Sequence, residues 1–255
     1  MLAWLKLLRP TTALLAAICT VAAFRVIHLP IPWIAVATIM AVASTAMLMN
    51  DWRDRQHDVL KGKVLPVEYP RAFLVFLLCM WGMSGVLIGF SFLLNGAGMG
   101  LMLTIIALAC LLYSETRRIA LLPCAFVAVV AASPALLPIT AGVGISDVLP
   151  LFLYAFFVVF GREVLKDIED AWIDSGYKWT IPVMVGRFWS EAIAIATIAI
   201  GLGIAASISP LTIPGIAIAS LQVIVLAKAK GDKPKIPRNI LDLGLAIIMF
   251  TLIAI

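Results

Sequence analysis

Two short acidic segments hold eight of the 14 carboxylates in this chain. The first, residues 50–58, reads NDWRDRQHD, and the second, residues 163–174, reads EVLKDIEDAWID. Both contain the spacing Asp-x2-Asp-x3-Asp, which places three acids within about 60° of one another on a helix that turns about 100° per residue. Carboxylates that share one helical stripe repel one another. The spacing therefore predicts that each segment binds a cation.

Magnesium is the cation that these side chains favour. The segments offer oxygen ligands without a His or Cys cluster, and Mg²⁺ typically binds one or two carboxylates together with substrate phosphates. We expect two or more Mg²⁺ ions with a diphosphate between the segments. The predicted metal ligands are Asp51, Asp54, Asp58, Asp167, Asp170 and Asp174. Three basic side chains are placed to contact the diphosphate oxygens, namely Arg162, Lys166 and Lys178.

The two segments are separated by a constant offset. Each Asp of the second spacing lies 116 positions after its counterpart in the first, and Pro182 lies 116 positions after Pro66. Such an offset is typical of the internal repeats that membrane folds build around a shared site. We interpret residues 1–255 as one domain with repeat halves at about 1–115 and 116–230, followed by an additional helix at about 237–255.

The elements that must position these segments are apolar. The 255 residues are 63% hydrophobic and 13% charged, with a mean hydropathy of +1.10, whereas about 25% of residues are charged in a soluble domain. This composition excludes an ordinary soluble enzyme, a disordered chain and a coiled coil. The chain contains no run of short alternating segments typical of a membrane β-barrel. We predict an all-α, polytopic membrane protein.

Nine stretches of the chain approach the roughly 20 apolar residues that a membrane-spanning helix needs. Two prolines inside the fifth stretch, Pro134 and Pro138, predict a kink, because proline removes a hydrogen bond within a helix. The predicted spans are 10–28, 31–50, 72–94, 98–114, 119–141, 147–166, 181–206, 210–228 and 237–255.

The basic residues predict the orientation of the spans. With nine spans, 18 of the 19 Lys and Arg side chains fall on the side that holds the N-terminus, and Arg25 alone falls on the other side. Basic residues collect in cytoplasmic loops, so the N-terminus and both acidic segments are predicted to be cytoplasmic and the C-terminus to lie outside. The net charge of +5 then reflects topology and contact with the lipid bilayer, not nucleic-acid binding.

At the two acidic segments the sequence resembles the UbiA superfamily of intramembrane aromatic prenyltransferases, whose signatures follow the second and sixth helices. The resemblance extends to Arg9-Pro10-Thr11, to the segment 176–182 (GYKWTIP) and to the predicted nine helices. The chain departs from the family in two places. It has KGKVLP at 61–66 where many members have an Asn-Arg-Pro-x-Arg-Pro-like loop, and it lacks an obvious asparagine near Cys124.

The resemblance implies an activity and further site residues. A member of this family would ionise an isoprenyl diphosphate with the help of Mg²⁺ and transfer the prenyl group to a lipophilic, aromatic acceptor. Asp54, Asp170 and Lys178 would then be catalytic. Asn50 and Lys63 would join the three basic residues in binding the diphosphate, and Tyr154 and Phe157 would line the prenyl pocket.

Two other functions remain open at this stage. A terpene cyclase of the same superfamily would use the same diphosphate machinery without an acceptor, because the double bonds of the substrate itself capture the cation. A transporter would also be built from repeats and carry acids in its membrane helices. The acids here collect at one predicted membrane face, and Asp242 is the clearest charge inside a span, which disfavours transport.

Overall fold

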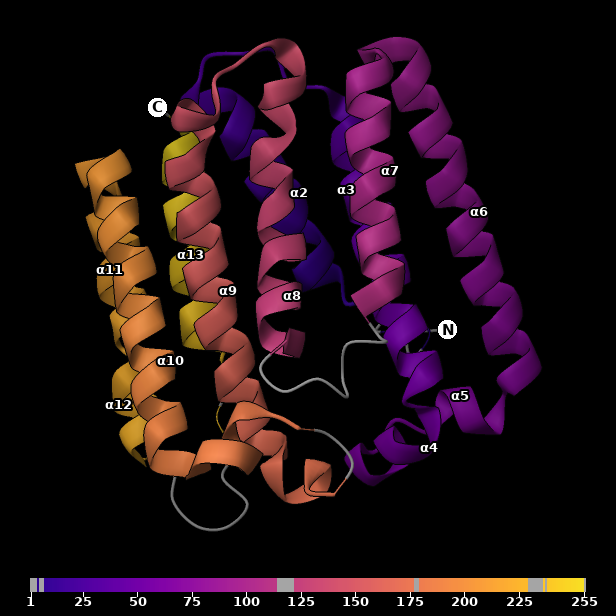
Figure 1. Ribbon diagram of the computed structural model, residues 1–255, viewed down its shortest axis with the longest axis vertical. Coiled ribbons are helices and arrows are strands. Elements are labelled where there is room, and N and C mark those ends of the chain that lie inside the picture. Colours follow the sequence, from indigo (N-terminus) through magenta and orange to yellow (C-terminus); the bar gives the residue numbers. More distant parts are fainter. Residues whose placement is uncertain are drawn as a thin grey trace. The chain divides into compact units, whose positions relative to one another are not determined.

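The computed structural model describes residues 4, 7–113, 122–176, 179–228, 236 and 238–254 (Figure 1). Within these residues the chain is helical and has no strand, so the prediction of an all-α fold is confirmed. The chain divides into two compact units. The first comprises Met1–Thr20 and Ile31–Ser114, and the second comprises Val21–Pro30 and Glu115–Ile255. The division after residue 114 lies next to the predicted boundary between the repeat halves, while the repeat itself stays a prediction.

The first unit is built on three long helices joined by short ones. A glycine with a φ of 91°, Gly96, separates α6 from α7, and a left-handed backbone of this kind is accessible to glycine without a steric penalty. The helix α2 (Pro10–Val26) begins in this unit and ends in the second. The remaining helices are α3 (Trp33–Arg53), α4 (Arg55–Asp58), η1 (Val59–Lys61), α5 (Leu65–Glu68), α6 (Pro70–Asn95) and α7 (Ala97–Tyr113).

Two buried hydroxyl pairs join α3 to α6. Thr38 lies 3.3 Å from Ser91, and Thr45 lies 3.1 Å from Ser84, measured between side-chain oxygens. From the first pair to the second, the residue number rises by seven on α3 and falls by seven on α6. The two helices are therefore antiparallel. Small polar pairs of this kind hold apolar helices together inside membranes, at roughly 0.6 kcal/mol each. They fix α3, which leads directly into the first acidic segment.

The second unit carries the remaining helices. The predicted kink corresponds to a change from α-helix to 3₁₀ helix at Ser133, where Pro134 and Pro138 lack the N–H groups that an α-helix uses. The longest helix, α9, carries the whole second acidic segment. The elements are α8 (Leu122–Ala132), η3 (Ser133–Ala141), α9 (Ile145–Asp174), α10 (Ile181–Ile208), η4 (Pro210–Thr212), α11 (Ile213–Ser220), α12 (Gln222–Lys228) and α13 (Asn239–Ala254).

Two glycines allow α9 and α10 to pack closely, and the two helices lie side by side in Figure 1. A Cβ atom on Gly161 of α9 would lie 2.9 Å from the carbonyl oxygen of Ala194. One on Gly201 of α10 would lie 3.1 Å from the carbonyl oxygen of Tyr154. Helices that lack side chains at their crossing approach by backbone contact, so the position of α9 is fixed by its neighbour.

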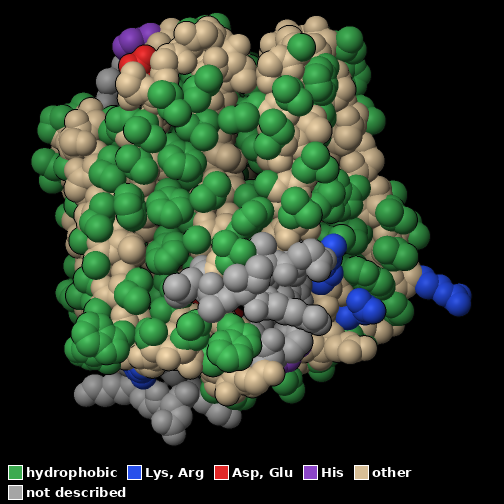
Figure 2. All heavy atoms as spheres, viewed as in Figure 1, with side chains coloured by type: hydrophobic (Ala, Val, Ile, Leu, Met, Phe, Trp, Pro, Cys, Tyr) green, Lys and Arg blue, Asp and Glu red, His purple; other side chains and the backbone are tan. Residues whose placement is uncertain are grey.

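The exterior of the helices suits a lipid environment. Five of the described helical segments are long and apolar enough to cross a membrane: Trp33–Arg53, Pro70–Asn95, Leu122–Ala141, Ile145–Asp174 and Ile181–Ile208. The other apolar helical segments are shorter: Pro10–Val26, Ala97–Tyr113, Pro210–Leu226 and Asn239–Ala254. Hydrophobic side chains are spread along the helix surface that is visible in Figure 2. The number of nine spans stays a prediction.

Candidate functional site

The first acidic segment interrupts its helix. The shared helical stripe requires one continuous helix through Asp51, Asp54 and Asp58, and this condition is not met in the first segment. The helix α3 ends at Arg53, Asp54 adopts φ −89° and ψ 4°, and the short helix α4 follows. The break still turns all three carboxylates inward, because Asp51, Asp54 and Asp58 are only 2%, 2% and 3% exposed.

The ammonium group of Lys63 lies between two of these carboxylates. Its Nζ donates to Oδ1 of Asp51 at 2.8 Å and to Oδ2 of Asp58 at 2.7 Å. A tight turn at Gly62, whose φ is 78°, reverses the chain and returns Lys63 to the segment. Because ionised carboxylates are costly to bury without partners, the ammonium stabilises the cluster. Its predicted role as a diphosphate ligand stays a prediction.

Arg9 is a member of this site that we did not predict. Its NH2 group donates to Oδ1 of Asp51 at 2.9 Å, and NH1 lies 3.3 Å from the sulfur of Met47. Arg9 has a φ of 45°, and a non-glycine residue in this region costs about 1–3 kcal/mol. The sequence marked Arg9 only through the resemblance of Arg9-Pro10-Thr11 to a family pattern, and its partner lies 42 residues away.

The second acidic segment, in contrast, lies on a continuous helix. Asp167 and Asp174 of α9 are 9% and 2% exposed, and Asp170 is partly buried. The thiol of Cys124, near the start of α8, donates to Oδ2 of Asp167 at 3.0 Å. The resemblance mentions Cys124 only as the place near which the family asparagine is missing. The structure makes it a neighbour of a predicted metal ligand.

The basic residues of the second segment have acidic partners. Nζ of Lys166 lies 2.8 Å from Oε2 of Glu163. Arg162 donates to both carboxylate oxygens of Asp242 on α13, at 2.7 and 3.1 Å, and also to Glu163 at 3.2 Å. Lys178 lies outside the described residues. The diphosphate contacts predicted for these three residues stay predictions.

The three other predicted residues lie on the helices that carry the acids. Asn50 precedes Asp51 on α3, and its carbonyl oxygen accepts the N–H of Asp54 at 2.9 Å. Tyr154 is 1% exposed on α9, one helical turn before Val158. The ring of Phe157 stands edge-on to that of Phe156, with centroids 5.3 Å apart. Their predicted roles in binding the diphosphate and prenyl chain stay predictions.

The donor set of the acidic segments fits Mg²⁺. In the part of the chain that the structure describes, no group of three or more His, Cys, Asp or Glu side chains is arranged to hold a metal ion. In the first segment an ammonium already lies between two carboxylates, which shows that a cation fits there. The ligands are hard oxygen atoms, as Mg²⁺ prefers. Metal binding by Asp51 and Asp58 stays a prediction.

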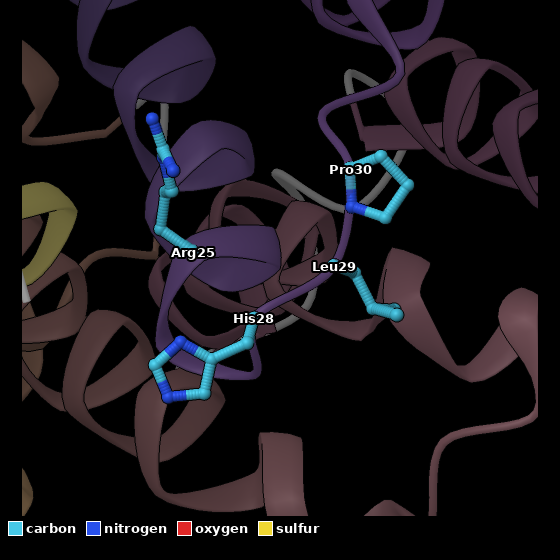
Figure 3. A pocket seen from close by; sticks show the side chains of 4 residues that line it. All are labelled: Arg25, His28, Leu29 and Pro30. Carbon is cyan, nitrogen blue, oxygen red and sulfur yellow. The ribbon is translucent and has the colours of Figure 1, made fainter.

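A pocket elsewhere includes none of the predicted site residues. It is lined by Arg25, His28, Leu29 and Pro30 at the end of α2 (Figure 3). The side chains of Arg25 and His28 point in different directions there. His28 has a φ of 56° and ends the helix through a bond from its N–H to the carbonyl oxygen of Arg25 at 2.9 Å. A cation at a helix C-terminus is favoured by the helix dipole, which explains the place of Arg25 in the last turn of α2.

The sequence matches the profile of the UbiA prenyltransferase family over residues 8–240. The chain belongs to this family. The match covers both acidic segments, so the predicted recognition is confirmed, and this UbiA protein is an integral membrane protein. The orientation of its termini stays a prediction. No curated protein matches the sequence.

Solved structures share the UbiA fold with this chain. A UbiA homologue from Aeropyrum pernix K1 matches with a TM-score of 0.74 at 17% identity, over 95% of each chain. A UbiA homologue from Archaeoglobus fulgidus, bound to GPP and Mg²⁺, matches with a TM-score of 0.68 at 16% identity, over 99% of this chain and 97% of that one. A digeranylgeranylglyceryl phosphate synthase matches with a TM-score of 0.66 at 18% identity, over 99% and 98%.

Proposed function

We propose that this protein is a Mg²⁺-dependent intramembrane prenyltransferase that transfers the prenyl group of an isoprenyl diphosphate to a lipophilic, aromatic acceptor. The observation that carries the proposal is the pair of acidic segments with buried aspartates in a chain of the UbiA prenyltransferase family. The Archaeoglobus fulgidus homologue with the same fold is bound to GPP and Mg²⁺. We extend that substrate class and that metal to this chain.

The six aspartates are the residues that would hold the metal. Asp51, Asp54 and Asp58 belong to the first acidic segment, and Asp167, Asp170 and Asp174 belong to the second. When bound, Mg²⁺ would neutralise the diphosphate and stabilise it as a leaving group. The proposal requires both segments to reach one diphosphate, as their common cytoplasmic side in the predicted topology allows.

The chain's own hydrogen-bond donors would act on the same oxygens. The amide of Asn50 and the ammonium groups of Lys63, Lys166 and Lys178 are proposed to donate hydrogen bonds to the diphosphate, which gains negative charge as the bond between prenyl carbon and oxygen breaks. The electron pair of that bond leaves with the diphosphate. Lys63 would exchange its present partners, Asp51 and Asp58, for substrate oxygens.

The apolar helices would protect the allylic cation that remains. Tyr154 is buried, and the ring of Phe157 stands edge-on to that of Phe156 on α9. Aromatic faces attract cations, by about 2 kcal/mol or more when desolvated, and an apolar wall excludes the water that would quench the cation. A carbon or hydroxyl nucleophile of the acceptor then forms the new bond and releases a proton.

Product analysis tests the proposal against terpene cyclisation. Purified protein in lipid is incubated with Mg²⁺ and geranyl, farnesyl or geranylgeranyl diphosphate, with and without a panel of lipophilic aromatic acceptors. The proposal predicts a prenylated aromatic only when an acceptor is present. A cyclic hydrocarbon formed from the diphosphate alone would instead assign the protein as a cyclase. An absence of turnover under all conditions would contradict both assignments.

A further inference from the structure

Two ion pairs connect the start of α13 to the end of α9 that carries the second acidic segment. Arg162 of α9 forms a bidentate ion pair with Asp242 of α13, with its Nε at 2.7 Å and its NH2 at 3.1 Å from the carboxylate oxygens. Arg238, immediately before α13, donates from NH1 to Oε2 of Glu169 at 3.2 Å. All four side chains are between 23% and 31% exposed.

The spacing of the four residues matches two antiparallel helices. Arg162 and Glu169 are seven residues apart, which is about two turns along one face of α9. Arg238 and Asp242 are four residues apart, and the N–H of Asp242 donates to the carbonyl oxygen of Arg238 at 2.9 Å. The earlier residue of each helix pairs with the later residue of the other. The stretch of α9 that the two pairs enclose contains the metal-ligand candidate Asp167.

Charged side chains, not backbone contact, provide these links. The backbone of α13 packs on α11, where a Cβ atom on Gly215 would lie 2.8 Å from the carbonyl oxygen of Gly244. Asp242 is the only charged residue within α13. A charged residue in an apolar helix costs free energy and normally has a partner and a function. A bidentate Arg–carboxylate ion pair provides geometric specificity in addition to its interaction energy.

We propose that Asp242 and Arg238 are positioning residues for the second acidic segment and that Arg162 serves this arrangement instead of binding the substrate. Asp242 and Glu163 occupy all three guanidinium nitrogens of Arg162. With Asp242 as its partner on α13 and the Arg238–Glu169 pair beside it, Arg162 holds the end of α9 in the rotation that directs Asp167 and Asp170 towards the diphosphate. This inference rests on the proposed prenyltransferase function and replaces the diphosphate contact predicted for Arg162.

A charge exchange tests the inference. Asp242→Asn and Arg162→Asp are each expected to raise the KM for geranyl diphosphate about tenfold with kcat changed less than about twofold, because coupled contacts of this kind contribute measurable interaction energies. The exchanged protein Arg162→Asp/Asp242→Arg is expected to return to within about twofold of the wild-type KM. A variant that merely folds poorly loses active protein, which lowers the apparent kcat and leaves KM unchanged.

Glu191→Gln is the matched control, since it removes the 2.6 Å ion pair with Arg187 within α10, and it is expected to leave KM unchanged. An exchanged protein as impaired as Arg162→Asp would overturn the inference, because Arg162 would then act on the substrate itself. A wild-type KM in Asp242→Asn would also overturn it. A wild-type protein without prenyl-transfer activity would instead contradict the proposed function. The melting temperatures of the single and exchanged variants would then still report whether the pairs hold the two helices.

Discussion

Replacing Lys63 with methionine is predicted to destabilise the first unit and to make its stability depend on Mg²⁺. The ammonium bridges Asp51 and Asp58, whose side chains are only 2% and 4% exposed. Loss of one partner from a fully buried ion pair costs about 3–5 kcal/mol. Because the Lys63 side chain is 32% exposed, solvent screening reduces the expected cost to about 1–3 kcal/mol.

The assay is thermal unfolding of the purified protein without substrate, at increasing Mg²⁺ concentration. Each kcal/mol lowers the melting temperature by about 2–4 °C in a chain of this size. Added Mg²⁺ is expected to raise the melting temperature of Lys63→Met more than that of the wild type, because a ligand stabilises according to its affinity and the ammonium no longer competes for the carboxylates. Lys228→Met, at the exposed end of α12, is the control.

Two results would refute this reasoning. One is a melting temperature of Lys63→Met equal to that of the wild type in the absence of Mg²⁺. The other is an equal rise with Mg²⁺ in both proteins, which would show that the ammonium does not occupy the position of the metal.

The remaining predictions concern two positions in the second unit and Arg9 in the first. Cys124→Ala is expected to weaken Mg²⁺ binding about three- to tenfold, because it removes the hydrogen-bond donor to Asp167. Cys124→Ser retains a donor, so its Mg²⁺ affinity should stay within about twofold of the wild-type value. Calorimetry measures both affinities. Gly161→Val is expected to lower the melting temperature, because a Cβ atom at this position would lie 2.6 Å from Ile198 and overpacking costs about 1–3 kcal/mol. Gly203→Ala is the control and should not lower it, because a Cβ atom there meets nothing within 4 Å. Removing the Asp51 partner by Arg9→Gln should lower the melting temperature by about 2–8 °C, and an unchanged value would contradict the pairing seen at 2.9 Å.

The helices could be predicted closely because apolar length and proline determine where a membrane helix begins and ends. The third predicted span, 72–94, is found as α6 at Pro70–Asn95, and the seventh, 181–206, as α10 at Ile181–Ile208. Both acidic segments could be predicted for the same local reason, since the spacing of the acids is contained in a few residues. The break at Asp54 could not, because the same spacing is compatible with one continuous helix.

The partners of Arg162 on α13 and of Arg9 could not be predicted, because they are distant in the chain. Arg162 was expected to contact a diphosphate because it lies beside the second segment. Its guanidinium group instead contacts Asp242, 80 residues later in the chain. Arg9 and Lys63 converge on one oxygen of Asp51 from opposite directions along the chain. Such contacts follow from how the helices pack, and no periodicity or motif of the sequence contains them.

The most direct test of the central claim is Mg²⁺-dependent release of diphosphate from geranyl diphosphate by the protein in lipid, compared with Asp54→Asn and Asp170→Asn. Each variant removes one charge from a different acidic segment and keeps the shape of the side chain. If both segments hold Mg²⁺ on one diphosphate, the wild type releases diphosphate only with Mg²⁺, and each variant loses at least about 100-fold in rate, which is about 2.7 kcal/mol of transition-state stabilisation. Release at the wild-type rate by both variants, or by the wild type without a divalent cation, would contradict the claim.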